Sequence, residues 1–365
     1  MKKLVMASFL LAGILGANAQ TLSLTTITPA SSTTVGGGSS VRVGTGAGAA
    51  LAATGANNVF IGTVTGGANT TGANNTYVGW AAAPNNTIGE YNTMLGRSAG
   101  ALTTTAWYNT FVGGLVGTKT TTGSQNTFVG FGAGAENITG GNNTVSGWGA
   151  GGLFNAWGNT IYGTKAGNQL VGDGNTVVGQ NAGYKAGSGN IMIGNNAGYN
   201  ETGNNKLFID VVTDANVASQ AANPLIWGDF ATDQLKLQGK VAIGGNSTTG
   251  FGNIPTLSGT TSLSAYNLFV KGGILTDEVR VTLNSTWADY VFADDYNLKP
   301  LSEVEAFITK NKHLPNVPSA AEVKEDGIAL GDMSRIQQEK IEELTLYIIA
   351  QNKRIEALEA KMTNK

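Results

Sequence analysis

Few residues of this chain could carry out chemistry. The sequence contains no Cys and one His, His313, which stands beside Leu314-Pro315, where a role in a turn is expected. It therefore offers neither a Ser-His-Asp set for nucleophilic catalysis nor a His or Cys cluster for zinc. In its Gly-rich stretches no Lys-Ser/Thr directly follows a Gly, as a phosphate-binding loop requires. We predict no enzyme activity, no catalytic or metal-binding residue and no cofactor.

Two pairs of adjacent carboxylates remain as candidates. They are Asp294-Asp295 and Glu342-Glu343, and the first pair could bind Ca²⁺ or do acid–base work. Adjacent acidic residues more commonly lie on solvated loops or helix surfaces, so we interpret both pairs as solvated.

The composition describes the elements that surround these residues. Gly accounts for 53 of the 365 residues and charged residues for only 13%, about twice and half of average usage. With 7 Pro and no Gly-X-Y period the chain is not collagen, and with 41% hydrophobic residues it is not a disordered chain. The net charge of −2 gives no electrostatic footprint for nucleic acid or anionic lipid.

The N-terminus has the pattern of a secretory signal peptide at residues 1–19. Lys2 and Lys3 precede an apolar run from Leu4 to Leu15, and Ala17-Asn18-Ala19 supplies a cleavage site, so the mature chain is expected to begin at Gln20. No later stretch is long and apolar enough to span a bilayer. We expect an exported protein at the cell surface or outside the cell, with the periplasm as a further option.

A five-residue unit, Asn-Thr-apolar-apolar-Gly, dominates the sequence. Its spacing is 17 residues five times, then 16, 16 and 15, and a tenth, degenerate copy begins at Asn205. Such a period indicates a solenoid of stacked coils. The repeat positions are Asn58, Asn75, Asn92, Asn109, Asn126, Asn143, Asn159, Asn175 and Asn190, closed by Gly62, Gly79, Gly96, Gly113, Gly130, Gly147, Gly163, Gly179 and Gly194.

Each unit predicts one very short strand between two turn residues. Asn and Gly tolerate positive φ and are placed where the coil turns. Adjacent strand residues face opposite ways, so one apolar column fills the coil and the other forms an outer stripe. We infer that other copies of the chain cover this stripe; a single chain that covers it with its own loops is the alternative. The pattern does not say which of the two columns fills the coil: the first column is Phe60, Tyr77, Met94, Phe111, Phe128, Val145, Ile161, Val177, Met192 and Leu207, and the second is Ile61, Val78, Leu95, Val112, Val129, Ser146, Tyr162, Val178, Ile193 and Phe208.

These Asn-Thr-Phe-Val-Gly units with following Ala-Gly pairs resemble the β-roll head repeats of trimeric autotransporter adhesins and the repeats of tail-fibre-like surface proteins of Bacteroidetes. The resemblance covers about residues 55–210, and it implies three β-rolls packed around an axis. The stretch from Trp287 through His313-Leu314-Pro315 to the C-terminus is similar to a C-terminal module of such proteins, which implies assembly or attachment and no chemistry.

Charge marks a change of domain, since residues 21–209 contain 10 charged side chains and residues 266–365 contain 28. Trp227 is expected to cap the apolar interior. Further on, Leu268–Val270 and Glu278–Thr282 are predicted strands, and Ser302 and Ser319 predicted helix caps. The expected organisation is a signal peptide (1–19), a Ser/Thr/Gly-rich segment (20–54), the β-roll repeats (55–210), a transition and linker (211–265), a small α+β module (266–332) and a coiled coil (333–365).

The last 33 residues carry heptads that predict a partnered helix. Trimer is favoured over dimer because of the β-roll resemblance, although Ile at a with Leu at d ordinarily favours two strands. An amphipathic helix packed within its own chain is the alternative. The expected oligomerisation residues are Ile341, Ile348, Ile355 and Met362 at a, and Leu344, Gln351 and Leu358 at d.

The predicted fold is thus mainly β: a parallel β-roll or solenoid of about ten 15–17-residue coils, a small α+β module and a coiled-coil helix. The expected function is an adhesin-like fibre that partners with itself as a homotrimer, with a glycan or surface ligand as a further possible partner. The alternative is a single-chain solenoid that binds carbohydrate, with Trp107 and Trp157 as candidate contacts, or ice. For ice the candidate is the Thr column, for which an inward or interface-facing position is favoured: Thr76, Thr93, Thr110, Thr127, Thr144, Thr160 and Thr176.

Overall fold

The computed structural model describes residues 33–36, 40–152, 155–212, 224–244, 257–258, 260–282 and 287–363. The predicted signal peptide lies outside the described residues. The chain divides into two compact units, Met1–Gln238 and Gly239–Lys365, which we call the repeat region and the C-terminal module.

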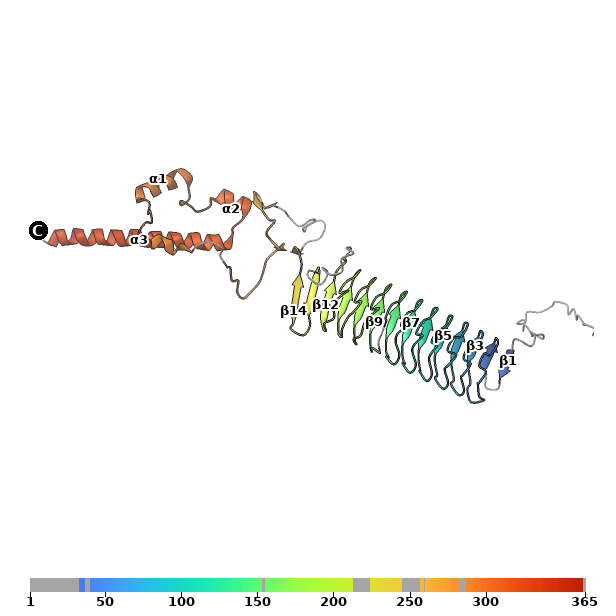
Figure 1. Ribbon diagram of the computed structural model, residues 1–365. Coiled ribbons are helices and arrows are strands. Elements are labelled where there is room, and N and C mark those ends of the chain that lie inside the picture. The colour runs from blue at the N-terminus through green and yellow to red at the C-terminus, as the bar shows by residue number, and fades with distance from the viewer. Residues whose placement is uncertain are drawn as a thin grey trace, which may run out of the picture. The chain divides into compact units, whose positions relative to one another are not determined.

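The repeat region is a parallel β-solenoid built from very short strands (Figure 1). Its sheet runs in sequence order from β1 to β14, and neighbouring strands from β2 to β12 are parallel. The predicted fold of about ten coils is confirmed. The parallel strands are β2 (Ser40–Val43), β3 (Val59–Ile61), β4 (Thr76–Val78), β5 (Thr93–Leu95), β6 (Thr110–Val112), β7 (Thr127–Val129), β8 (Thr144–Ser146), β9 (Thr160–Tyr162), β10 (Thr176–Val178), β11 (Ile191–Ile193) and β12 (Lys206–Ile209).

Both edges of this parallel stack are closed by antiparallel strands. β1 (Thr33–Gly36) pairs antiparallel with β2, and β13 (Ile226–Asp229) pairs antiparallel with β12 and with β14 (Gln234–Leu237). Trp227 of β13 packs against the apolar core, as the sequence predicts. The antiparallel strands pair the two outermost strands of the parallel stack, so β1 and β14 become the edge strands of the sheet.

One residue of each short strand points into the coil, and this column forms the core. The structure assigns the first of the two columns to the interior, since Phe60 through Met192 in it are all at most 1% exposed. The tenth coil is an exception to the predicted register, because Met192 pairs with Phe208 and not with Leu207. The repeat pattern aligns Leu207 with Met192, but Phe208 is the buried residue, because the step to the last strand is one residue longer than the alignment by Asn205 assumes and a shift of one residue exchanges the two faces.

The repeated Asn residues do not sit at positive φ, contrary to the turn role predicted for them. The residue before each Asn takes that conformation, for example Asn74, Tyr91 and Asn142. The repeated Asn is itself buried and hydrogen-bonds to the next coil: the Asn109 side-chain oxygen accepts from the backbone N–H of Asn126 at 3.0 Å. The same bond recurs at every step from Asn58 to Asn190 and ends on the N–H of Lys206.

Two constraints require Gly at the end of each unit: a positive φ and the close approach of the next coil. Gly113 has a φ of +140°, and a Cβ built on it would lie 2.4 Å from the carbonyl oxygen of Gly130 in the next coil. Any side chain would therefore strain the backbone and separate the coils. The same arrangement recurs from Gly62 to Gly179, each against the following Gly.

The C-terminal module is built around the long helix α3 (Leu330–Thr363) (Figure 1). It also contains two small sheets, a 3-10 helix and two short helices. These are β15 (Val241–Ile243) paired with β18 (Leu268–Val270), β16 (Leu257–Ser258) paired with β17 (Thr261–Ser262), η2 (Ala288–Phe292), α1 (Leu301–Asn311) and α2 (Ala320–Asp326).

Some local predictions in this module are confirmed and others are wrong. The strand at Leu268–Val270 is confirmed, whereas residues 278–282 form no strand. Ser319 caps α2 through a reciprocal capping box with Glu322, as predicted. Ser302 does not cap α1, because the helix begins at Leu301 and the N-cap position is taken by Pro300, which has no side-chain acceptor.

Candidate functional site

The outer face of the solenoid sheet presents two side-chain columns that flank the buried one. The Thr column and the second apolar column both point outward, since the residue between them is buried in every strand from β3 to β11. Ile61 and Val129 are each 39% exposed, and Tyr162 is 64% exposed. No charged residue occupies either column in these strands. We call this surface the outer face.

The Thr ladder therefore lies on the surface of the chain and does not fill its interior. Thr76 to Thr110 are partly exposed and Thr127 to Thr176 are exposed. The inward placement considered for these hydroxyls is wrong, because a three-residue strand has only one inward position and the aromatic or aliphatic residue takes it. At both ends of the outer face the Thr position becomes apolar, with Val59 at one end and Ile191 at the other.

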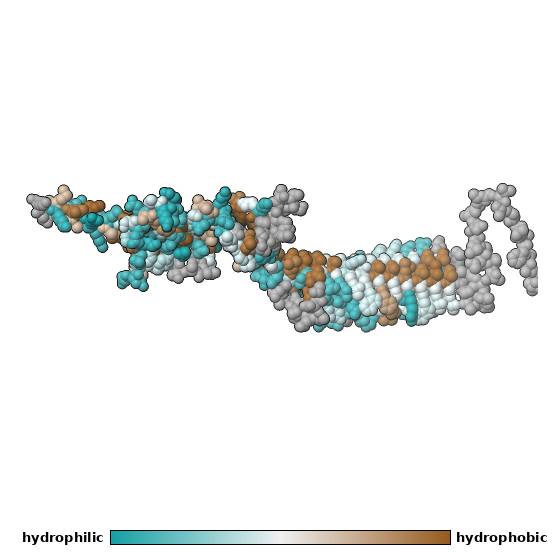
Figure 2. Space-filling model, turned by 90° about the horizontal axis from the view of Figure 1, so that it is seen from above, coloured by the Kyte–Doolittle hydropathy of each residue, from teal (hydrophilic) through white to brown (hydrophobic). Residues whose placement is uncertain are grey.

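Exposed aromatic rings lie near both ends of the short strands. Trp80, Phe131 and Trp148 come directly after the closing Gly residues and are each more than half exposed. Arg97 lies 5.3 Å from the Trp80 ring, and Lys165 lies 5.1 Å from the Trp148 ring. Figure 2 shows apolar side chains gathered in stretches along the repeat region.

The two predicted glycan contacts stand before the strands and do not form one cluster. Trp107 and Trp157 are 45% and 47% exposed. Three coils separate them in sequence, which corresponds to roughly 14 Å along the stack. Trp157 lies over Gly141 of the preceding coil, where an added Cβ would come within 2.6 Å of the ring. Beside Trp107, Tyr91 and Tyr108 stack with ring centroids 5.0 Å apart.

The two carboxylate pairs differ in their exposure to solvent. Asp294 and Asp295 are exposed, as predicted. Glu342 is only 5% exposed, so the solvated interpretation of its pair is wrong. The sequence pattern of α3 does not reveal that η2 and the segment after it pack on this side of the helix. Glu342 accepts a hydrogen bond from Gln338 at 2.9 Å.

A network of charges and phenols joins α3 to this segment. Lys340 lies 2.8 Å from both Glu339 and Glu343. Tyr296 donates to Glu343 at 2.5 Å, and Tyr290 donates to Glu339. Burial alone would raise the pKa of Glu339, but the hydrogen bonds from Lys340 and Tyr290 outweigh it and lower that pKa. The network positions η2 on α3.

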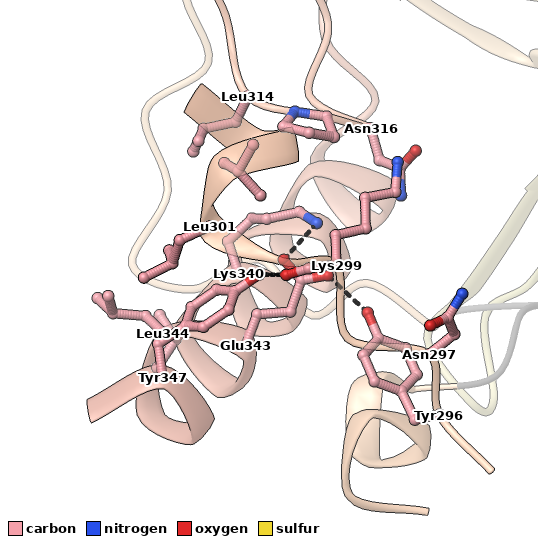
Figure 3. Close-up of a pocket in the computed structure, with 13 residues that line it drawn as sticks. Tyr296, Asn297, Lys299, Leu301, Leu314, Asn316, Lys340, Glu343, Leu344 and Tyr347 are labelled. Atoms are coloured by element: carbon pink, nitrogen blue, oxygen red, sulfur yellow. Dashed lines mark hydrogen bonds and ion pairs between the residues drawn. The ribbon is translucent and has the colours of Figure 1, made fainter. Parts of the chain in front are cut away.

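A cleft of about 490 Å³ lies between α1 and α3 (Figure 3). Leu301 and Leu314 line one side of it together with Leu344 of α3, and Tyr296 and Asn297 line the other. Ile341 also lines the cleft. Two of the predicted heptad residues, Ile341 and Leu344, thus line the cleft.

The predicted heptad residues form one exposed, mainly apolar face along α3. Ile341, Leu344 and Ile348 are each 57% exposed. The other members are exposed as well: Gln351, Ile355, Leu358 and Met362. We call these seven residues the seam. In the chain by itself the described residues leave the seam largely uncovered, so the packing of α3 on η2 uses a different face.

Within the described residues, no three His, Asp or Glu side chains gather as a metal site, and no helix is long and apolar enough to cross a membrane. His313 follows α1 in a bend and packs edge-on against Phe307. No protein-family model, no curated protein and no solved structure matches this chain.

Proposed function

We propose that this chain is an exported, non-enzymatic fibre protein that assembles as a homotrimer. The observation that carries the proposal is the seam on α3. A 34-residue helix with exposed Ile, Leu and Met at a and d positions gains stability when other helices cover that face. A second copy of the same helix is the partner that the heptad repeat fits.

Charges beside the seam favour parallel helices. With Ile341 at a, Arg354 takes a g position and Glu359 the e position five residues later. In a parallel coiled coil, g of one chain faces e of the next, so Arg354 meets an opposite charge. In an antiparallel arrangement g faces g, which brings together basic residues such as Arg354 and Lys361.

The outer face supports the same proposal. It is long, uncharged and in large part apolar, and soluble monomers rarely expose such surfaces. Packing of three repeat regions through this face would cover Ile61, Val129 and their equivalents. The resemblance to the heads of trimeric adhesins and to tail-fibre-like surface proteins agrees with this arrangement, and implies a role at the cell surface or outside the cell.

The test is the absolute mass of residues 20–365 by light scattering at several concentrations. We expect three chains, and a shorter chain of residues 20–332 that is monomeric or aggregated. Ile348→Asp should dissociate the assembly, whereas Ile349→Asp, on the neighbouring exposed residue outside the seam, should leave it intact. A monomeric unaltered chain, or equal effects of both variants, would refute the proposal.

One observation favours a second candidate, a single-chain solenoid that binds carbohydrate or ice. The Thr ladder lies on the outer face with one hydroxyl per coil, at a spacing of about 4.8 Å. Exposed rings such as Trp107 and Trp157 are of the kind on which sugars stack. Thermal hysteresis and glycan-array binding test the two ligands. A signal that survives replacement of the Thr ladder by Ala, or of Trp107 and Trp157 by Ala, would eliminate those residues as the binding site for the corresponding ligand.

A further inference from the structure

A second column of polar side chains runs inside the repeat region, apart from the repeated Asn ladder. Each member follows the same turn, in which its backbone N–H donates to a residue three positions earlier. The next residue of each coil hydrogen-bonds to its equivalent in the following coil at 2.8–2.9 Å, so the members stand directly above one another. The column consists of Asn69, Asn86, Thr103, Thr120 and Asn137, and all five are 0% exposed.

Every member of this column has a polar atom without a hydrogen-bond partner in the described part of the chain. The unpartnered atoms are the hydroxyl oxygens of Thr103 and Thr120, the side-chain oxygens of Asn86 and Asn137, and both amide atoms of Asn69. Native interiors rarely leave such atoms unpaired, and five consecutive coils with the same deficit cannot be an isolated irregularity. A ligand inside the coils accounts for all of them together.

We propose that this column binds a single file of buried water molecules. Neighbouring coils lie about 4.8 Å apart, and a water that makes two hydrogen bonds of about 2.8 Å at an angle of about 120° spans the same distance. One water therefore fits between successive members, which gives on the order of four waters for five residues. Together they replace the hydrogen bonds that the side chains cannot make directly.

The donors and acceptors of the column suit water. The side-chain nitrogens of Asn86 and Asn137 donate to the carbonyl oxygens of Gly89 and Gly140 at 3.1 and 3.0 Å. These bonds fix the amide orientation and leave the two oxygens as acceptors. The hydroxyls of Thr103 and Thr120 can both donate and accept. The site is thus uncharged and needs a small ligand that both donates and accepts.

The type of residue at the column position marks where the file ends. In two later coils the equivalent positions are Leu170 and Ala186, both fully buried. An apolar side chain removes the need for water, so the file belongs to the earlier coils.

A crystal structure of residues 20–365 at about 1.2 Å resolution tests the proposal directly, since waters at 2.6–3.0 Å from the unpartnered atoms are expected. Magnetic relaxation dispersion of water oxygen in solution should show the same long-lived waters. An interior without density, or an atom at 2.3–2.5 Å from several oxygens, as a bound cation would give, overturns it.

Thr103→Val provides a second readout, because the two cases predict opposite signs. If the hydroxyl is bound to water, its replacement by a methyl group breaks the file and lowers the melting temperature. If the hydroxyl is dry and unpaired, the same replacement raises the melting temperature. Thr127→Val on the outer face is the matched control and should change it little. A raised melting temperature for Thr103→Val refutes the proposal.

Discussion

The repeat region and the C-terminal module bury polar side chains in different ways. In the repeat region the buried polar residues are neutral, and each Asn of the ladder bonds to the equivalent Asn one coil away. In the C-terminal module the buried polar residues are charged, and Glu339 bonds to unique partners on other elements. The first arrangement uses one contact many times, and the second uses several different contacts once.

The consequence concerns how each unit responds to change. A neutral ladder has no proton to gain or lose near pH 7, and its stability is the sum of similar contacts between neighbouring coils. The ion network depends on protonation and on the precise fit of one segment against α3. We therefore expect the repeat region to respond to changes of backbone fit and the C-terminal module to respond to pH.

The largest effect should come from the Gly ladder. Gly113→Ala adds a Cβ 2.4 Å from the carbonyl oxygen of Gly130 at a φ of +140°, and we expect it to lower the free energy of unfolding by about 3–5 kcal/mol. Gly132→Ala is the control, because its Cβ would meet nothing within 4 Å and only backbone strain of about 1 kcal/mol remains. Urea unfolding followed by circular dichroism measures both. Equal losses would contradict the close-approach explanation.

The Asn ladder should give the next largest effect. Asn109→Ala removes an acceptor for the Asn126 N–H and a donor to the Gly123 carbonyl, which leaves buried groups unpaired at a cost of about 2–4 kcal/mol. Asn142→Gly changes an exposed Asn at positive φ and should alter stability by about 0.5 kcal/mol or less. The same urea titrations compare them. If the two variants unfold alike, the buried amide contributes no more than a surface turn.

Lowering the pH should destabilise the C-terminal module and leave the repeat region folded. The pKa of Glu339 is lowered in the folded module, so its contribution to stability is present above the ordinary glutamate pKa and is lost as pH falls through the lowered value. Hydrogen exchange of the whole chain at pH 7 and pH 3 should show lost protection in η2 and the first half of α3, with the strands β4–β10 still protected. Glu339→Gln should weaken this pH dependence. Parallel loss of protection in both units would argue against the comparison.

The smallest effect concerns stacking on the surface of the repeat region. Tyr91 and Tyr108 stack at 5.0 Å with an interplanar angle of 11°, and a double-mutant cycle to Ala should give a coupling of about 0.5–1.5 kcal/mol. A coupling near zero would show that the one-coil spacing orders these rings without stabilising the stack.

Sequence reasoning succeeded where a feature repeats. The two apolar columns, the closing Gly residues and the strand centres follow from a period of 17, 16 or 15 residues, because each coil must superimpose on the last. It failed where repetition ends. The degenerate copy at Asn205 was aligned by its Asn, whereas the structure pairs Met192 with Phe208 and places Lys206 at the end of the Asn ladder.

It also failed for side chains whose role depends on what lies across the coil. The conformational preference of Asn suggested a turn, yet the buried amide serves the ladder and the preceding residue takes the turn conformation. The polar column of Asn69 to Asn137 has no short motif, since Asn and Thr alternate irregularly along it. In the C-terminal module, the heptad pattern predicts an apolar seam on α3 but does not predict the burial of Glu342 beside it.

The sequence by itself determined that this chain stacks coils and ends in a heptad-bearing helix, because periodicity acts through local backbone geometry and needs no knowledge of distant contacts. Only the tertiary structure decided which polar atoms are buried, which columns face outward and which carboxylates join the ion network. Those properties depend on residues that are far apart in the chain and close in space, and a hydrogen bond or an ion pair forms only where the fold brings its two partners within about 3 Å.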